Sequence, residues 1–329
     1  MPAEKECYTL RNKIAVLGAG TMGPGIATTY ALEGYEIALY SRSQQTLDRA
    51  RKVIVSNLEL FVEERRITQE TADAALSRIC YTDSVAEAVE GAWYIAETVV
   101  EKPDVKTQLY AQLDQILEPG VIIASNTSAL DIFSFMPAGR QSHTLIAHWF
   151  APAHILPLVE VVRGPQTLDE VMDRVVQLHQ QCGKTPVRME RYIPGFIINR
   201  MQGALTREVM LLLENGYCTP EDLDLAVKTS LMPRGMILGL VQRMDFAGLD
   251  MMANGMNNKA YTPAPAPEHP ALIFDPVKRG DLGVKTGKGL YDYSHMPYEQ
   301  VLQHRDRMLL KSVALAQEFI ETPLHKKEK

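Results

Sequence analysis

A histidine and a glutamate twelve residues apart carry the first chemical signal in this 329-residue chain. His148 ends one apolar segment, and Glu160 lies inside the next one, Leu158–Val162. Histidine titrates near neutral pH, so it can take the proton of an alcohol while hydride leaves the carbon. A carboxylate on the other ring nitrogen would fix the tautomer and stabilise the imidazolium. If the two segments are paired strands, the pair is suited to oxidising a hydroxyl group.

A glycine-rich turn near the N-terminus predicts a dinucleotide site. The spacing is G-x-G-x-x-G, directly after an apolar segment and at the start of a helical one. The first glycine would form the tight turn, the second would let the backbone approach a pyrophosphate, and the third would let helix and strand pack closely. Free N–H groups at the helix start would bind the phosphates. The cofactor-binding candidates here are Gly18, Gly20, Thr21, Met22 and Gly23.

The end of the next strand bears on which dinucleotide binds. An acid that holds the ribose 2′-hydroxyl is expected there, but Tyr40 is followed by Ser41 and Arg42. A serine hydroxyl and a guanidinium would bind a 2′-phosphate, which an acid would repel. The sequence therefore favours NADP, with NAD as the alternative.

The elements that must position these residues alternate between strands and helices up to about residue 190. Helices are expected over Met22–Glu33, over Thr46–Arg65 and from near Leu168, where Thr167 and Glu170 have the spacing of a capping box. Strands are expected at Lys13–Leu17, Glu36–Tyr40, Ile79–Tyr81, Trp93–Glu97, Val121–Ser125, Thr144–Ala147, Leu158–Val162 and Thr185–Val187. This alternation predicts an α/β fold with a Rossmann-type, doubly wound and mostly parallel sheet.

After Pro194 the pattern is helical only. Apolar residues recur every three or four positions from Ile198 to Leu212 and again in the last helix, Pro297–Glu321. Thr219, followed by Pro220, is typical of a helix start, and it predicts a further helix between these two segments. We therefore expect a dinucleotide-binding domain over residues 1–192 and an all-α domain for substrate binding and dimerisation over residues 193–329.

Composition excludes several classes of protein. A net charge of −6 gives no general attraction for nucleic acid or an anionic membrane. No apolar run is long enough to span a bilayer, and the first residues lack the apolar core of a signal peptide. The four cysteines are scattered, and no metal-ligand spacing is present, so we expect no metal. The sequence predicts a cytoplasmic homodimer that acts on a small molecule.

Several further segments, taken with the glycine turn, resemble the 3-hydroxyacyl-CoA dehydrogenase family. The resemblance runs from about Lys13 to Tyr293. It includes the segments 97–102, 125–128, 148–152, 158–162, 194–200, 248–250 and 285–291. It implies a Rossmann-type domain followed by a helical domain that dimerises, and hydride transfer between a nicotinamide dinucleotide and the 3-hydroxyl or 3-keto carbon of a 3-hydroxyacyl-CoA.

The resemblance also implies roles for individual residues. His148 would be the catalytic base and Glu160 its orienting partner, while Ser128 and Asn199 would hold the substrate oxygen and the histidine. Residues expected to bind the cofactor are Glu101, Lys106 and Asn126. Two plainer interpretations stay open at this point: Ser128 could cap a helix starting near Ala129, and Asn199 could be a buried amide that serves loop backbone.

Two departures from the family pattern bear on the substrate. Ala151 stands where the family usually has an asparagine, and Arg234 lies where the branch acting on free hydroxy acids, such as gulonate and carnitine dehydrogenases, has an arginine. An arginine there could bind a substrate carboxylate. The alternatives to an acyl-CoA dehydrogenase are therefore a dehydrogenase of a free 3-hydroxy acid and a dinucleotide-binding structural or sensing protein, since the family includes a lens crystallin.

Overall fold

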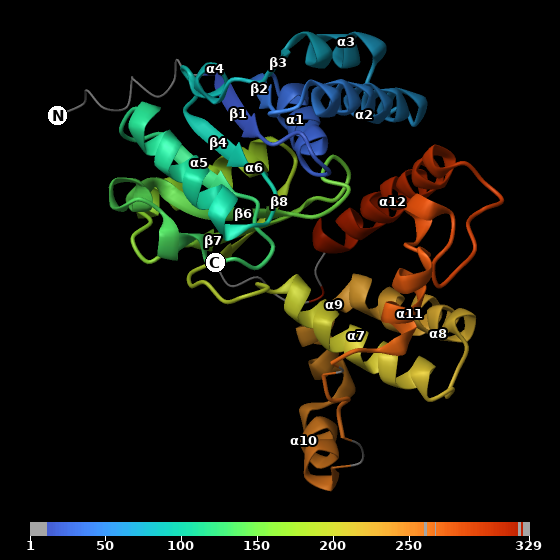
Figure 1. The fold of residues 1–329 in the computed structure, drawn as a ribbon. Coiled ribbons are helices and arrows are strands. Elements are labelled where there is room, and N and C mark those ends of the chain that lie inside the picture. The colour runs from blue at the N-terminus through green and yellow to red at the C-terminus, as the bar shows by residue number, and fades with distance from the viewer. Residues whose placement is uncertain (1–11, 260–261, 267, 322–323, 325–329) are drawn as a thin grey trace. The chain divides into compact units, whose positions relative to one another are not determined.

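The computed structural model describes residues 12–259, 262–266, 268–321 and 324 (Figure 1). The chain divides into two compact units, Met1–Asn199 and Arg200–Lys329. The first unit is built on a sheet, and the second is built from helices.

An eight-stranded sheet forms the centre of the first unit. Its strands are β1 (Lys13–Leu17), β2 (Glu36–Tyr40), β3 (Ile79–Thr82), β4 (Tyr94–Glu97), β5 (Ile122–Ser125), β6 (Thr144–Trp149), β7 (Leu158–Arg163) and β8 (Thr185–Met189). They lie in the order β3-β2-β1-β4-β5-β6-β7-β8, and only the pair β6 and β7 is antiparallel. The predicted Rossmann-type, mostly parallel sheet is confirmed. Its strand order reverses beside β1, where sheets of this kind bind ligands at their carboxyl ends.

Helices cover both faces of this sheet (Figure 1). One core joins the sheet to α1 (Gly23–Leu32), α2 (Gln44–Glu63), α3 (Gln69–Ser77) and α6 (Asp169–Gln181). The other core joins it to α4 (Val85–Val89), α5 (Pro103–Ile116) and the 3₁₀ turn η1 (Ile132–Phe135); a second 3₁₀ turn, η2 (Ala138–His143), leads into β6. In β1, Ile14 and Val16 enter the first core, whereas Ala15 and Leu17 enter the second. Strand residues buried on both faces must be apolar, and residues 14–17 of β1 are.

The start of α6 differs from the predicted capping box. The residue that precedes the helix is Leu168, and no side chain caps it. The Thr167 hydroxyl instead donates to the Thr144 carbonyl at 2.5 Å and accepts from the Gly164 N–H at 2.9 Å. Thr167 therefore fastens the loop after β7 to the start of β6, because its buried hydroxyl finds backbone partners in the sheet.

The second unit is helical, as predicted. Its elements are α7 (Ile198–Glu214), α8 (Pro220–Ala226), the π-helical turn η3 (Val227–Leu231), α9 (Met232–Ala247), α10 (Leu249–Asn258), α11 (Ala271–Arg279), the 3₁₀ turn η4 (Val284–Thr286) and α12 (Tyr298–Glu321). The Thr219 hydroxyl accepts the Asp222 N–H at 3.1 Å and so caps α8 as the sequence indicates. Helix α9 is kinked at Gly239, whose φ is 66°.

Within the described part of the chain, no helix combines the length and the apolar character needed to cross a membrane. The same residues contain no group of three or more histidine, cysteine, aspartate or glutamate side chains placed to hold a metal ion.

Candidate active site

The glycine turn joins β1 to α1 and lies against the loop that follows β4. Gly18 has a φ of 121°, and a Cβ there would lie 2.5 Å from the Thr98 carbonyl oxygen. A Cβ on Gly23 would overlap the Gly18 carbonyl oxygen. Apart from its chain neighbours, no atom of the described residues lies within 4 Å of a Cβ built on Gly20. Two glycines are thus required by packing, and the middle one keeps open the space that a pyrophosphate would need.

The N-terminus of α1 fits a phosphate group. Met22 is the residue that precedes the helix, and no side chain forms a capping hydrogen bond there. Thr21 beside it is exposed. Backbone N–H groups at an uncapped helix start, together with the helix dipole, favour an anion. The turn and the helix start therefore fit the pyrophosphate of a dinucleotide.

The carboxyl end of β2 carries charges of both signs. Ser41 donates its N–H to the Thr82 carbonyl at 3.2 Å, and Arg42 is exposed. Tyr40 pairs with Thr82, the last residue of β3, so Asp83, which directly follows β3, lies near the end of β2. Burial raises the pKa of Tyr40, Arg42 lowers it and Asp83 raises it, so both charges act at this strand end. Sequence reasoning missed Asp83, because this acid follows the neighbouring strand β3 rather than β2.

Strand pairing brings His148 and Glu160 together. The two residues are directly opposite in the antiparallel pair β6 and β7. His148 Nδ1 lies 2.8 Å from Glu160 Oε2, and both side chains are buried. A carboxylate at Nδ1 holds the proton on that nitrogen, which leaves Nε2 as the nitrogen able to accept a proton. The geometry that the sequence predicted is present.

The second oxygen of Glu160 binds the start of α7. Glu160 Oε1 accepts the N–H groups of Ile197 and Ile198 at 3.0 and 2.9 Å. The preceding residue, Phe196, has a left-handed φ of 49°, and its buried ring lies 5.2 Å from the His148 ring. A left-handed non-glycine residue is uncommon, and such residues cluster at functional sites. Sequence reasoning missed Phe196, because an apolar residue in a P-G-F turn carries no polar signal.

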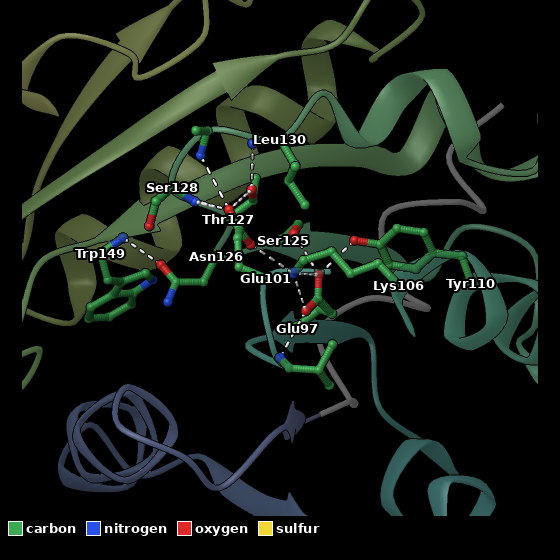
Figure 2. Close-up of polar contacts among 12 residues, drawn as sticks. Glu97, Glu101, Lys106, Tyr110, Ser125, Asn126, Thr127, Ser128, Leu130 and Trp149 are labelled. Atoms are coloured by element: carbon green, nitrogen blue, oxygen red, sulfur yellow. Dashed lines mark hydrogen bonds and ion pairs between the residues drawn. The ribbon is translucent and has the colours of Figure 1, made fainter. Parts of the chain in front are cut away.

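Ser128, Asn199 and Asn126 are brought to the carboxyl ends of β5 and β6. Asn199 Nδ2 donates to the Ser128 carbonyl at 3.4 Å. Asn126 Oδ1 accepts the Trp149 N–H at 2.8 Å (Figure 2). Asn126 thus lies beside the residue that follows His148. Asn199 serves loop backbone, as one interpretation held, but it is half-buried rather than buried.

The interpretation of Ser128 as a helix cap is wrong. No helix begins near Ala129, and the next helical element is η1, which Asp131 caps through the Phe133 N–H at 3.2 Å. The Ser128 side chain is exposed, and its backbone N–H donates to Glu101.

Glu101 and Lys106 belong to one polar network at the ends of β4 and β5 (Figure 2). Burial alone would raise the pKa of Glu101, but hydrogen bonds from Thr127 and Ser128 and the charge of Lys106 hold it below its ordinary value. Glu101 is therefore a carboxylate at neutral pH. Lys106 is fully buried, and its ammonium lies 2.7 Å from Glu97 Oε1.

This burial changes the interpretation of Lys106. Its ammonium, which has no exposed surface, contacts Glu97 and Glu101, and its predicted contact with the cofactor stays a prediction. The sequence prediction therefore missed the centre of the network, Glu97, although a single acid in the apolar strand Tyr94–Glu97 is a detectable signal.

Arg234 lies near the start of α9 and is exposed. Its guanidinium donates to the Ser230 carbonyl at 3.1 Å and to the Ser230 hydroxyl at 3.0 Å. These are contacts within the helical unit, and the predicted contact with substrate stays a prediction. Ala151, which follows β6, is exposed.

Together, the sheet, the glycine turn and the buried histidine–glutamate pair define a nicotinamide-dependent oxidoreductase. The model of the 3-hydroxyacyl-CoA dehydrogenase NAD binding domain matches residues 13–192, and the model of the C-terminal domain of the same enzymes matches residues 195–293. The chain belongs to the 3-hydroxyacyl-CoA dehydrogenase family, as the sequence motifs indicated.

Three known proteins show the breadth of this similarity. A probable 3-hydroxybutyryl-CoA dehydrogenase of Deinococcus radiodurans is 33% identical over 291 residues, which cover 85% of this chain and 100% of that protein. The 5-formyl-3-hydroxy-2-methylpyridine 4-carboxylate 5-dehydrogenase of Mesorhizobium japonicum is 29% identical, covering 92% and 96%. A crystal structure of a dehydrogenase for this pyridine carboxylic acid, described as an NAD⁺-dependent dismutase, has a TM-score of 0.81 at 26% identity, covering 94% and 99%.

Proposed function

We propose that this enzyme oxidises the 3-hydroxyl group of a 3-hydroxyacyl-CoA to a keto group, and catalyses the reverse reduction. The observation that carries the proposal is the buried His148–Glu160 pair, with its 2.8 Å contact at Nδ1. A protein that only binds dinucleotides needs no such pair, which argues against a purely structural or sensing role. The acyl-CoA substrate is supported by the 3-hydroxybutyryl-CoA dehydrogenase relative.

In this proposal each polar residue has one task. His148 Nε2 takes the hydroxyl proton, and Glu160 stabilises the imidazolium that forms. Ser128 and Asn199 hold the substrate oxygen. The nicotinamide, when bound, accepts or supplies the hydride. Residues 1–192 would bind the dinucleotide, and the helical residues 193–329 would bind the acyl chain and a second subunit.

We further propose that the enzyme prefers NADP. Arg42 can pair with a 2′-phosphate, and Ser41 leaves β2 without the acid that would repel one. Asp83 opposes this preference by its charge. We expect tighter binding of NADPH than of NADH, a reversed order in the Ser41→Asp/Arg42→Ala variant, and a stronger NADPH preference in Asp83→Asn. Fluorescence titration at low salt measures all three, and equal affinities in the parent would refute the proposal.

A free hydroxy acid is the second candidate substrate, and Arg234 is the observation that favours it. Its exposed guanidinium could bind a carboxylate through two hydrogen bonds. A thioester has no charge at that place and would leave the guanidinium unpaired. The Mesorhizobium relative is named for a substrate with a carboxylate. Ala151 stands where the family usually has an asparagine, which weakens the acyl-CoA assignment but points to no other substrate.

The deciding experiment compares kcat/KM for 3-hydroxybutyryl-CoA with kcat/KM for free 3-hydroxy acids, in the parent and in Arg234→Met. We expect the parent to prefer the thioester and the substitution to change this little. If the parent prefers the free acid and Arg234→Met removes that preference selectively, the second candidate replaces the first.

A further inference from the structure

Glu97 is a fully buried carboxylate that the proposed reaction does not use. It stands at the carboxyl end of β4 and accepts hydrogen bonds on both oxygens (Figure 2). Lys106 Nζ donates at 2.7 and 2.8 Å, the Tyr110 hydroxyl at 2.6 Å, the Ser125 hydroxyl at 2.5 Å and the Val99 N–H at 2.9 Å. Burying a charge is costly unless it is paired and hydrogen-bonded. Such complete satisfaction rigidifies the groups around it.

The network continues from Glu97 to a second loop through Lys106. The Lys106 ammonium also lies 3.6 Å from Glu101 Oε2. Glu101 Oε1 in turn accepts the Thr127 hydroxyl at 2.5 Å and the next two backbone N–H groups at 2.8 and 3.3 Å. One buried charge thus connects the loop after β4 with the loop after β5.

Both loops lie where the dinucleotide is expected. Strand β4 pairs with β1, and β5 pairs with β4, all in parallel, so their carboxyl ends lie at the same edge of the sheet as the glycine turn. The loop after β4 touches that turn directly, since its Thr98 carbonyl leaves no room for a side chain at Gly18. The loop after β5 carries Asn126 and Ser128, two of the predicted site residues.

We propose that Glu97 is a positioning residue that acts through Lys106 to hold the loops 98–101 and 126–130 in the shape that binds the nicotinamide dinucleotide. The inference rests on the proposed cofactor site at this edge of the sheet. Glu97 itself has no exposed surface, so its effect reaches the cofactor only through the residues that it holds.

The charges predict how each substitution acts. Glu97→Gln preserves volume but leaves Lys106 with Glu101 as its remaining carboxylate, which draws Glu101 away from the Thr127 hydroxyl and the 128–129 N–H groups. Lys106→Met leaves two carboxylates without the ammonium between them, and two like charges in one site cannot both stay ionised easily. The pKa of Glu101 then rises, because Lys106 is one of the groups that lower it.

The experiment measures cofactor Kd and the thermal midpoint in Glu97→Gln, Lys106→Met and Arg140→Met. Arg140 is the matched control, because it is a buried cation that pairs with Asp114 near the far end of the same helix, α5, at 2.9 Å. We expect the first two variants to bind cofactor roughly 10- to 100-fold more weakly, as misplaced binding groups do. Arg140→Met should lose thermal stability and keep the parent's Kd.

A double variant separates positioning from stability. Glu97→Gln/Lys106→Met removes both charges, so it should regain thermal stability over the single variants while its cofactor Kd stays weak. Lys106→Met should also lose cofactor affinity more steeply than the parent as pH falls, since Glu101 then takes up a proton at a higher pH than in the parent. Where the single variants do not fold, Ser125→Ala removes one hydrogen bond from Glu97 and should weaken binding less.

Two results would overturn the inference. In one, the variants lose stability but bind cofactor as the parent does. In the other, affinity returns together with stability in the double variant, which makes the network a structural support only. A parent that binds neither NADPH nor NADH would instead overturn the proposed function, and this inference with it.

Discussion

At the scale of single residues, the two oxygens of Glu160 have different tasks. Oε2 faces His148, and Oε1 accepts two N–H groups at the start of α7, where the positive end of the helix dipole favours a negative charge. An amide in place of this carboxylate has one acceptor oxygen instead of two. The Glu160→Gln change therefore disturbs either the imidazole or the start of the helix that carries Asn199.

A second histidine makes stability depend on pH. His179 is fully buried; its Nδ1 lies 2.7 Å from the Val175 carbonyl and its Nε2 lies 3.1 Å from the Tyr30 hydroxyl. Burial lowers the pKa of His179 from 6.5 to about 4. As pH falls, the unfolded chain takes up a proton at this histidine at a higher pH than the folded chain does. His179 therefore leaves the free energy of unfolding unchanged above pH 6.5 and lowers it as pH drops from 6.5 towards 4. The loss amounts to about 3 kcal/mol.

We expect His179→Gln to flatten this pH dependence, since the amide can bond to the Tyr30 hydroxyl without titrating. Urea unfolding of the parent and of His179→Gln at several pH values measures this dependence. The control is His304→Gln, a substitution of an exposed histidine. A parent whose unfolding free energy does not change between pH 6.5 and 4 would contradict the assignment.

At the scale of elements, the three glycines of the turn make separable contributions. Gly20→Ala meets no atom of the described residues beyond its own chain neighbours, so it should fold normally and weaken dinucleotide binding by occupying the pyrophosphate's space. Gly23→Ala meets the Gly18 carbonyl, so it should destabilise the sheet unit. Thermal unfolding and cofactor titration of both variants measure the difference. Equal thermal midpoints for the two would contradict this division.

Helices and strands could be predicted from the sequence where a single physical rule determines them. The bounds of β1 and β2 match the expected Lys13–Leu17 and Glu36–Tyr40, because apolar strands buried on both faces leave a clear signal. The prediction that Thr167 caps α6 was wrong. A capping motif describes partners that are close in sequence, whereas the Thr167 hydroxyl bonds to Thr144 on a distant strand. Pairing between His148 and Glu160 was predictable from their spacing across two adjacent strands. The polar network around Glu97 could not be predicted, because it depends on the register between two strands, β4 and β5, and on the placement of helix α5.

At the scale of the whole molecule, the helical unit exposes many large apolar side chains. Val241 is 77% exposed on α9, and Met251 and Met256 are 69% and 72% exposed on α10. Contiguous exposed apolar surface is typical of an interface. We propose that the helical residues form a homodimer, with α12 near the seam.

Light scattering at micromolar concentration should therefore give twice the 36.8 kDa chain mass. Met251→Lys should shift the protein towards monomer, because a buried charge opposes association. The control Val53→Lys, on α2 of the sheet unit, should stay dimeric. A monomeric parent would refute the proposed assembly.

The central claim is that His148, oriented by Glu160, is the base for hydride transfer at a dinucleotide site. The most direct measurement is kcat together with cofactor Kd in His148→Ala. Loss of a general base typically lowers kcat by about 10²- to 10⁴-fold. We predict a fall in that range with nearly unchanged cofactor affinity, since the histidine contacts Glu160 rather than the glycine turn. Near-native kcat in His148→Ala would contradict the account.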